Sequence, residues 1–247
     1  METAERTRDT TPSLVRVRMR AIENDLDTGA YRPGPWSRLL AEMRNLPIAD
    51  RGALAEDVSR ISRKLHLRHG QRMVSATIGY ALELLLTLAG LVLLAIAVRS
   101  ESSALAIVVA LVWTMTLQPL IKVGVGYTLG IRYEYAYLYG VEPRFKMRFG
   151  DYVARPRWAR IVVHVSGMIG SPLGAWLPTV FLGKSQWLAI DVCLLLFWIV
   201  MAINLFSFIA VLSGVAKRIG SLRLADGSGG AAALELREAL EIAPASG

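Results

Sequence analysis

Four long blocks of apolar residues divide this chain and are separated by polar segments. The first block runs from Val74 to Val98 and contains a single charged residue, Glu83. At a helical rise of about 1.5 Å per residue, this block can cross the roughly 30 Å hydrocarbon core of a bilayer. The other blocks cover residues 104–127, 161–182 and 187–212. The pattern predicts an all-α polytopic membrane protein with four transmembrane helices within a domain at 74–214.

The polar segments around these blocks predict shorter helices. Residues 1–35 are polar, and we expect them to be disordered except for a short amphipathic helix that carries the basic residues Arg16, Arg18 and Arg20. Its apolar face suits either a membrane interface or packing on the protein's own polar part. Residues 36–73 predict a helical hairpin that breaks at Pro47. After the last span we expect a tail at 215–247 with a flexible linker at 226–230 and a short helix at 231–242.

Basic residues are distributed unevenly among the connections, and this predicts the orientation. Fourteen Lys or Arg precede the first span, seven lie in the loop at 130–160, and four follow the last span. The two remaining connections carry only Arg99 and Lys184. Basic loops stay on the cytoplasmic side, so we expect both termini and the loop at 130–160 to be cytoplasmic. The expected location is the cytoplasmic (inner) membrane of a bacterium. No apolar core occurs in the first thirty residues, so no cleavable signal peptide is expected.

Composition narrows the classes of partner and chemistry. The net charge of +8 comes from basic residues that flank the spans, which favours anionic lipid headgroups over nucleic acid. The single cysteine, Cys193, excludes an intrachain disulfide and is expected to be a small buried side chain. The chain has three histidines, no His or Cys cluster, and no HExxH, Walker or nucleophile-elbow motif. We therefore expect no metal site, and the sequence does not identify a cofactor.

Three ionisable residues lie in the predicted cytoplasmic halves of the spans: Glu83, Lys122 and His164. A charge at bilayer depth costs about 2.5–3.5 kcal/mol on insertion scales, so each requires a structural or functional reason. Each of these three residues shares its helical face with small and polar residues, which predicts that all three side chains point into the bundle. Lys122 could either reach the cytoplasmic surface or pair with Glu83. Three further residues lie at similar depth and are candidate ligand-binding residues: Tyr80, Gln118 and Tyr127.

These polar groups allow two interpretations. They could form a pocket open to the cytoplasm, in which Glu83 and His164 are the candidate catalytic residues. They could instead pair internally and hold the bundle together.

The loop at 130–160 has an unusual pattern of aromatic and basic residues. Four tyrosines alternate from Tyr133 to Tyr139; a strand would place them on one side, and a helix would split them into two pairs. Arg144, Lys146 and Arg148 follow among further aromatic residues. Such a mixture is typical of a membrane-interface belt, and also of a surface for a phosphate-bearing ligand. At about thirty residues the loop is long enough to be functional.

Three functions follow from these features. The first is a non-catalytic membrane protein whose basic, aromatic cytoplasmic face binds anionic lipid, a partner protein or a second copy of the chain. The second is a lipid-processing enzyme with a pocket formed by Glu83, Lys122 and His164, and with Arg144, Lys146 and Arg148 on the phosphate. The third is a small proton-coupled transporter that acts as an oligomer.

Overall fold

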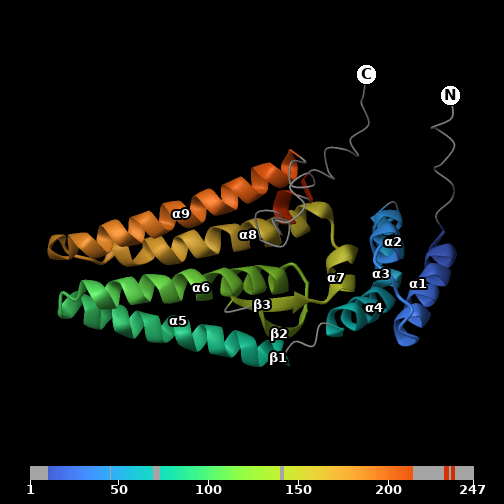
Figure 1. Ribbon diagram of the computed structural model, residues 1–247, viewed down its shortest axis with the longest axis horizontal. Coiled ribbons are helices and arrows are strands. Elements are labelled where there is room, and N and C mark those ends of the chain that lie inside the picture. The colour runs from blue at the N-terminus through green and yellow to red at the C-terminus, as the bar shows by residue number, and fades with distance from the viewer. Residues whose placement is uncertain are drawn as a thin grey trace, which may run out of the picture. The chain divides into compact units, whose positions relative to one another are not determined.

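The computed structural model describes residues 11–44, 46–68, 73–139, 142–213, 231–233 and 235–236 (Figure 1). The chain divides into two compact units. The first, which we call the N-terminal unit, comprises the described parts of Met1–Arg72 together with Met147–Pro156. The second, which we call the membrane unit, comprises Met73–Lys146 and the described parts of Arg157–Gly247.

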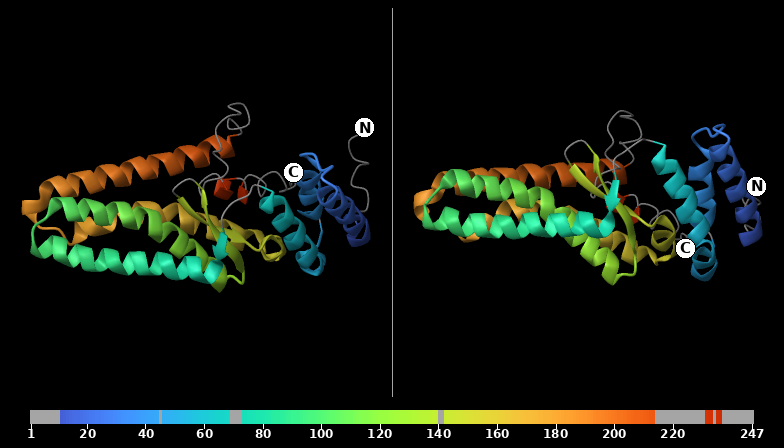
Figure 2. Two further views of the ribbon diagram at one scale, coloured as in Figure 1. Left: turned by 60° about the horizontal axis from the view of Figure 1, so that its bottom comes forward. Right: turned by 90° about the horizontal axis from the view of Figure 1, so that it is seen from below.

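The membrane unit contains four helices that are long and apolar enough to cross a membrane. They are α5 (Ala76–Arg99), α6 (Ser103–Thr128), α8 (Arg157–Trp176, continued by the 3-10 turn η1 at Leu177–Val180) and α9 (Trp187–Leu212, preceded by the 3-10 turn η2 at Lys184–Gln186). Figures 1 and 2 show these helices lying alongside one another. The predicted mostly helical chain with four helices that could cross a membrane is therefore confirmed.

A small antiparallel sheet departs from the predicted all-α fold. Strand β1 (Met73–Ser75) pairs with β2 (Tyr133–Tyr139), and β3 (Glu142–Met147) follows in the order β1-β2-β3. Val74 lies opposite Ala136, so the start of the predicted first span is a strand. The alternating tyrosines form a strand because aromatic residues favour a pleated, half-buried surface. The sheet lies where α5 begins and α6 ends; we call this the sheet end and the opposite end the turn end (Figure 2).

Helices α6 and α8 pack closely through small residues. A Cβ added at Gly174 would lie 2.3 Å from the backbone carbonyl of Trp113, and one at Gly170 would lie 2.6 Å from the Cα of Gln118. Between these contacts the Ser171 hydroxyl donates a hydrogen bond of 2.7 Å to the Gln118 side-chain carbonyl. Close backbone approach supplies dispersion contacts, which hold helices together where no hydrophobic effect operates.

Polar side chains connect the other helix pairs. The Trp113 indole donates to the carbonyl of Thr87 at 3.0 Å, and the hydroxyls of Thr87 and Thr116 lie 2.9 Å apart, so α5 is joined to α6. The Asn204 amide donates to the carbonyl of Met168 at 3.1 Å and joins α9 to α8, as its position in the span predicts. Cys193 is buried, as expected.

The N-terminal unit is a bundle of short helices. It contains α1 (Pro12–Asp27), α2 (Pro35–Arg44), α3 (Ile48–Ala53), α4 (Ala55–Leu67) and α7 (Phe149–Ala154). Its core consists mainly of side chains from α1, α2 and α4: Val15, Met19, Ile22, Leu39, Met43, Val58 and Ile61. The apolar face of α1 is therefore covered by the protein itself, which is the second of the two environments that its sequence allowed.

Helix α7 comes from the loop at 130–160 but belongs to the N-terminal unit. The amide of Gly150 donates to the Ser59 hydroxyl at 3.0 Å, and a Cβ at Gly150 would lie 1.7 Å from the carbonyl oxygen of Ala55. Arg51 donates to the carbonyl of Val153 at 3.2 Å. The loop is thus divided, because its strands belong to the membrane unit and its helix packs on α3 and α4.

Ion pairs on the surface of the N-terminal unit connect α1 to α4. Arg60 and Lys64 contact the Glu23 carboxylate at 2.8 and 2.9 Å, and Lys64 contacts Asp27 at 2.7 Å. The hydrogen bond from Arg60, assisted by Lys64, lowers the pKa of Glu23 to about 2. These exposed pairs fix which faces of α1 and α4 meet, although each contributes little stability.

Candidate functional site

Glu83 lies on the buried face of α5, near the sheet end. Only 5% of the residue is exposed, and the same face carries Gly79, Gly90 and Leu94. The opposite face carries exposed large aliphatic side chains, including Leu82, Leu85, Leu88 and Val92. This division agrees with the helical pattern, in which small and polar residues line protein contacts and large aliphatic residues face lipid.

The Glu83 carboxylate makes no hydrogen bond or ion pair with the part of the chain that the structure describes, and its Oε2 atom is buried. The backbone carbonyl of Glu83 accepts a hydrogen bond of 2.9 Å from the hydroxyl of Thr87. The pairing of Glu83 with Lys122, which the sequence left open, does not occur among these residues.

Replacing Glu83 by methionine is expected to stabilise the membrane unit by about 1–3 kcal/mol, because the substitution removes a buried polar group without a partner and keeps most of the volume. Thermal unfolding of the full chain in detergent measures the change. Glu83→Gln is the matched control and should gain less, since an amide is also polar. A loss of stability in Glu83→Met would mean that the carboxylate binds something outside the described residues.

The second group of polar residues lies between α6 and α8. His164 is buried on α8. The positive charges of Lys122 on α6 and Arg160 on α8 lie close enough to act on its ring. Arg160 and His164 are four residues apart, so they share one helix face. We call Lys122, Arg160 and His164 the basic cluster. A concentration of cationic groups near a membrane surface attracts anions.

A segment far along the sequence contributes an acid to this cluster. Arg160, 4% exposed, forms an ion pair of 3.3 Å with the carboxylate of Glu235. Glu235 lies in the helical residues 235–236, and Ala232 and Ala233 in the helical residues 231–233 are also buried. The remainder of the predicted helix at 231–242 and the linker at 226–230 lie outside the described residues. The C-terminal segment therefore places a carboxylate on a cation of the basic cluster.

The other candidate ligand-binding residues inside the spans contact neighbouring helices and strands. Gln118 accepts the hydrogen bond from Ser171 and connects α6 to α8. A Cβ at Gly124 would lie 3.8 Å from the Tyr80 hydroxyl, so the Tyr80 side chain extends from α5 to α6. The ring of Tyr127 packs on that of Tyr133 with centroids 5.6 Å apart, and Tyr127 is half-exposed.

Tyr133 anchors the sheet to α6. Its hydroxyl donates to the backbone carbonyl of Lys122 at 3.0 Å, and a Cβ at Gly126 would overlap its ring. Burial, with a smaller contribution from Tyr127, raises the pKa of the Tyr133 phenol. The phenol is therefore a neutral hydrogen-bond donor at physiological pH, and β2 is held beside the basic cluster.

The three candidate ligand-binding residues of the loop occupy different units. Arg144 and Lys146 lie on β3 of the membrane unit, whereas Arg148 belongs to the N-terminal unit. Burial lowers the pKa of Lys146, and the charge of nearby Glu134 opposes this shift. Arg148 forms an ion pair with Glu56 and lies 3.9 Å from the carboxylate of Asp151.

Sequence reasoning missed Arg160 and Glu235. Arg160 stands among the basic residues of the loop in the sequence, although its spacing from His164 places both on one face of a helix. No sequence signal connects Glu235 with Arg160, because their contact depends on the path of the chain after α9.

Taken together, the fold and these residues define a helical protein with four helices long and apolar enough to cross a membrane, and with a basic cluster at the sheet end. Comparisons with protein-family models, curated proteins and solved structures found no match to this chain. Among the described residues, no group of three or more His, Cys, Asp or Glu could hold a metal ion.

Proposed function

We propose that this protein is a non-catalytic integral membrane protein that binds the headgroup of an anionic lipid at its sheet end. The sheet end and both termini face the cytoplasm in this proposal, because basic residues are concentrated there. The observation that carries the proposal is the ion pair of the buried Arg160 with Glu235, in a cluster that also contains Lys122 and His164.

The arrangement suits a phosphate or carboxylate for an electrostatic reason. Lys122 and Arg160 each carry a positive charge, and the Glu235 carboxylate lies 3.3 Å from the Arg160 guanidinium. Arginine and lysine bind phosphate through charge-assisted hydrogen bonds that are stronger than neutral ones. Arg144 and Lys146 on β3 add positive charge to the same unit. Glu235 occupies a position on Arg160 that a lipid phosphate could take instead.

The enzyme alternative has less support. It requires Glu83, Lys122 and His164 to act on one substrate, yet no hydrogen bond or ion pair joins Glu83 to either residue in the described parts of the chain. A proton-coupled transporter would use Glu83 alone. The stability of Glu83→Met tests both alternatives, because each of them assigns a function to the Glu83 carboxylate.

Binding of phosphatidylglycerol to the full chain in neutral detergent tests the proposal. Lys122→Gln is expected to lower the affinity about tenfold, the loss of one charge-assisted contact of about 1.4 kcal/mol. Glu235→Gln is expected to raise the affinity, because it removes the internal competitor. Phosphatidylcholine should bind more weakly than phosphatidylglycerol, and added salt should reduce the difference.

Lys184→Gln is the matched control, because it removes a lysine at the turn end. If Lys122→Gln and Lys184→Gln have equal effects, or if the two lipids bind equally well, the proposed headgroup site is wrong. A decrease in affinity in Glu235→Gln would mean that Glu235 supports the site and does not compete for it.

A further inference from the structure

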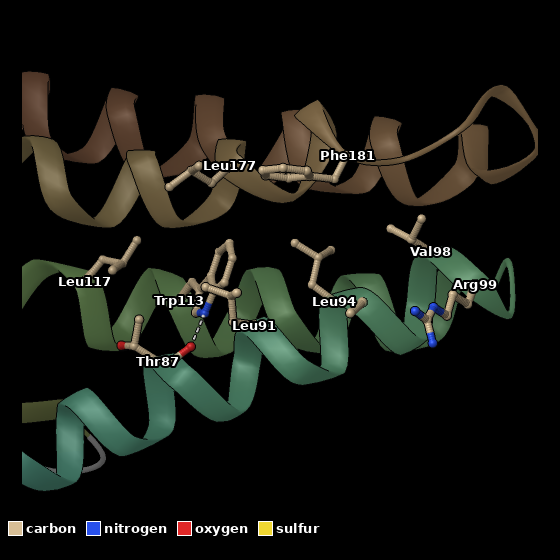
Figure 3. Close-up of a pocket in the computed structure, with 10 residues that line it drawn as sticks. Thr87, Leu91, Leu94, Val98, Arg99, Trp113, Leu117, Leu177 and Phe181 are labelled. Carbon is tan, nitrogen blue, oxygen red and sulfur yellow. Dashed lines mark hydrogen bonds between the residues drawn. The ribbon is translucent and has the colours of Figure 1, made fainter.

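A groove at the turn end of the membrane unit is separate from the basic cluster. It has a volume of about 520 Å³ and lies between α5 and α6 on one side and α8 with its 3-10 turn on the other (Figure 3). This volume is within the range of about 300–1,000 Å³ that is usual for small-molecule sites. Figure 3 shows Leu177 and Phe181 facing Leu94, Trp113 and Leu117 across the groove.

The walls of the groove are apolar, and its mouth is open. Leu94 and Trp113 are buried and belong to one core cluster, so they form a fixed floor. Leu91 and Phe181 are more than half exposed and line the same groove. The polar edge of the indole already donates its hydrogen bond to the carbonyl of Thr87. The floor therefore offers hydrocarbon contacts to a hydrocarbon ligand.

The length of the groove corresponds to one leaflet of a bilayer. Its lining extends along α5 from Thr87 to Arg99, twelve helical steps, which is about 18 Å at the rise of an α-helix. Half of a hydrocarbon core of roughly 30 Å is about 15 Å. An acyl chain that lies along this groove would reach from the bilayer centre to the membrane surface.

A single basic side chain lies at the surface end of the groove. Arg99 is an exposed lining residue, and its guanidinium makes no hydrogen bond or ion pair with the residues that the structure describes. Arginine binds a phosphate through two parallel hydrogen bonds. Charge complementarity therefore specifies an anionic headgroup at this end.

We infer that the groove binds one phospholipid from the leaflet at the turn end, with an acyl chain along Leu91, Leu94 and Trp113 and an anionic phosphate headgroup on Arg99. This site does not depend on the basic cluster. The two sites lie at opposite ends of the helices, so variants at Lys122 and at Arg99 test them separately.

The test reconstitutes the full chain in nanodiscs of phosphatidylcholine that contain a minor fraction of phosphatidylglycerol. Native mass spectrometry then measures the phospholipid that remains bound after release from the disc. Arg99→Ala is expected to lower retention of phosphatidylglycerol about tenfold relative to the parent protein, and to lower retention of phosphatidylcholine less, because the choline ammonium offsets the charge of its phosphate. Lys184→Ala is the matched control, because it removes the other basic side chain of the turn-end connections, and it should leave retention unchanged.

Ala95→Trp tests the acyl chain. Ala95 lines the groove and is exposed, so a larger side chain can fill the groove without entering the core. Retention of both phospholipids should fall. Unchanged retention in Ala95→Trp, or equal effects of Arg99→Ala and Lys184→Ala, would overturn the inference.

A second copy of the chain is the other possible occupant of an apolar groove. Phe181→Cys places a thiol at the mouth, whereas the native Cys193 is buried. Efficient disulfide-linked dimer formation by Phe181→Cys in nanodiscs would show that protein covers the groove, and it would overturn the lipid assignment. A monomer under the same conditions supports the assignment.

Discussion

Replacing Gly174 by alanine is expected to destabilise the membrane unit by about 2–3 kcal/mol. The added Cβ would lie 2.3 Å from both the carbonyl carbon and the carbonyl oxygen of Trp113 and 2.5 Å from the amide of Thr114. All three contacts are with the backbone, so no side-chain rotation can relieve them, and α6 and α8 must move apart. Thermal unfolding of the full chain in detergent, followed by tryptophan fluorescence, measures the effect.

Gly124→Ala is the matched control for Gly174→Ala, because Gly124 also lies within a membrane-spanning helix. A Cβ at Gly124 would make only an ordinary contact of 3.8 Å with the Tyr80 hydroxyl. Alanine is favoured over glycine in a helix by about 1 kcal/mol, so this variant should be as stable as the parent protein or slightly more stable. Equal stability of the two alanine variants would contradict the close contact of α6 with α8.

Replacing Gly150 by alanine is expected to destabilise the N-terminal unit by about 3 kcal/mol, at the upper end of the range for overpacked sites. The Cβ would lie 1.7 Å from the carbonyl oxygen of Ala55 and 2.4 Å from its carbonyl carbon. Relief of this overlap would pull α7 away from α4 and break the hydrogen bond between the Gly150 amide and Ser59. Hydrogen exchange should increase in α7 and α4, as measured by mass spectrometry on the full chain.

Gly52→Ala is the control within the same unit, because no atom lies within 4 Å of a Cβ at that position. It should leave the exchange of α4 and α7 unchanged. If Gly150→Ala also leaves it unchanged, α7 does not pack on α4 as the structure describes. The membrane-spanning helices provide an internal reference, since neither substitution should change their exchange.

Gly174→Ala also bears on the proposed functions. Lys122 and Gln118 lie on α6, and the residues that they face, His164 and Ser171, lie on α8. The contact at Gly174 therefore sets the distance between the two helices that carry the basic cluster and one wall of the groove. A variant that separates α6 from α8 should alter lipid binding at both sites, whereas Lys122→Gln and Arg99→Ala should each alter only one.

The sequence by itself determined the class of this protein. Each apolar block has the length and composition of a bilayer crossing, and this property is local, so it can be read without knowledge of the fold. The inward direction of Glu83 followed in the same way, because helical periodicity places it with Gly79 and Gly90 and opposite the leucines. The hydrogen bond of Asn204 was predictable because a polar amide within a span requires a partner.

Only the tertiary structure decided which of these residues meet. The strand at Met73–Ser75 forms because it pairs with Tyr133–Tyr139. The sequence did not predict it, because the partner is some sixty residues away and a three-residue strand has no periodicity of its own. The division of the loop at 130–160 between two units depends on the close approach of Gly150 to Ala55.

The candidate sites depended on tertiary structure in the same way. Sequence spacing could not place Glu235 on Arg160, nor align Leu177 and Phe181 with Arg99 along one groove. Periodicity determines which face of a helix is buried. It does not determine which neighbouring helix covers that face, because that choice depends on contacts between residues that are distant in the chain.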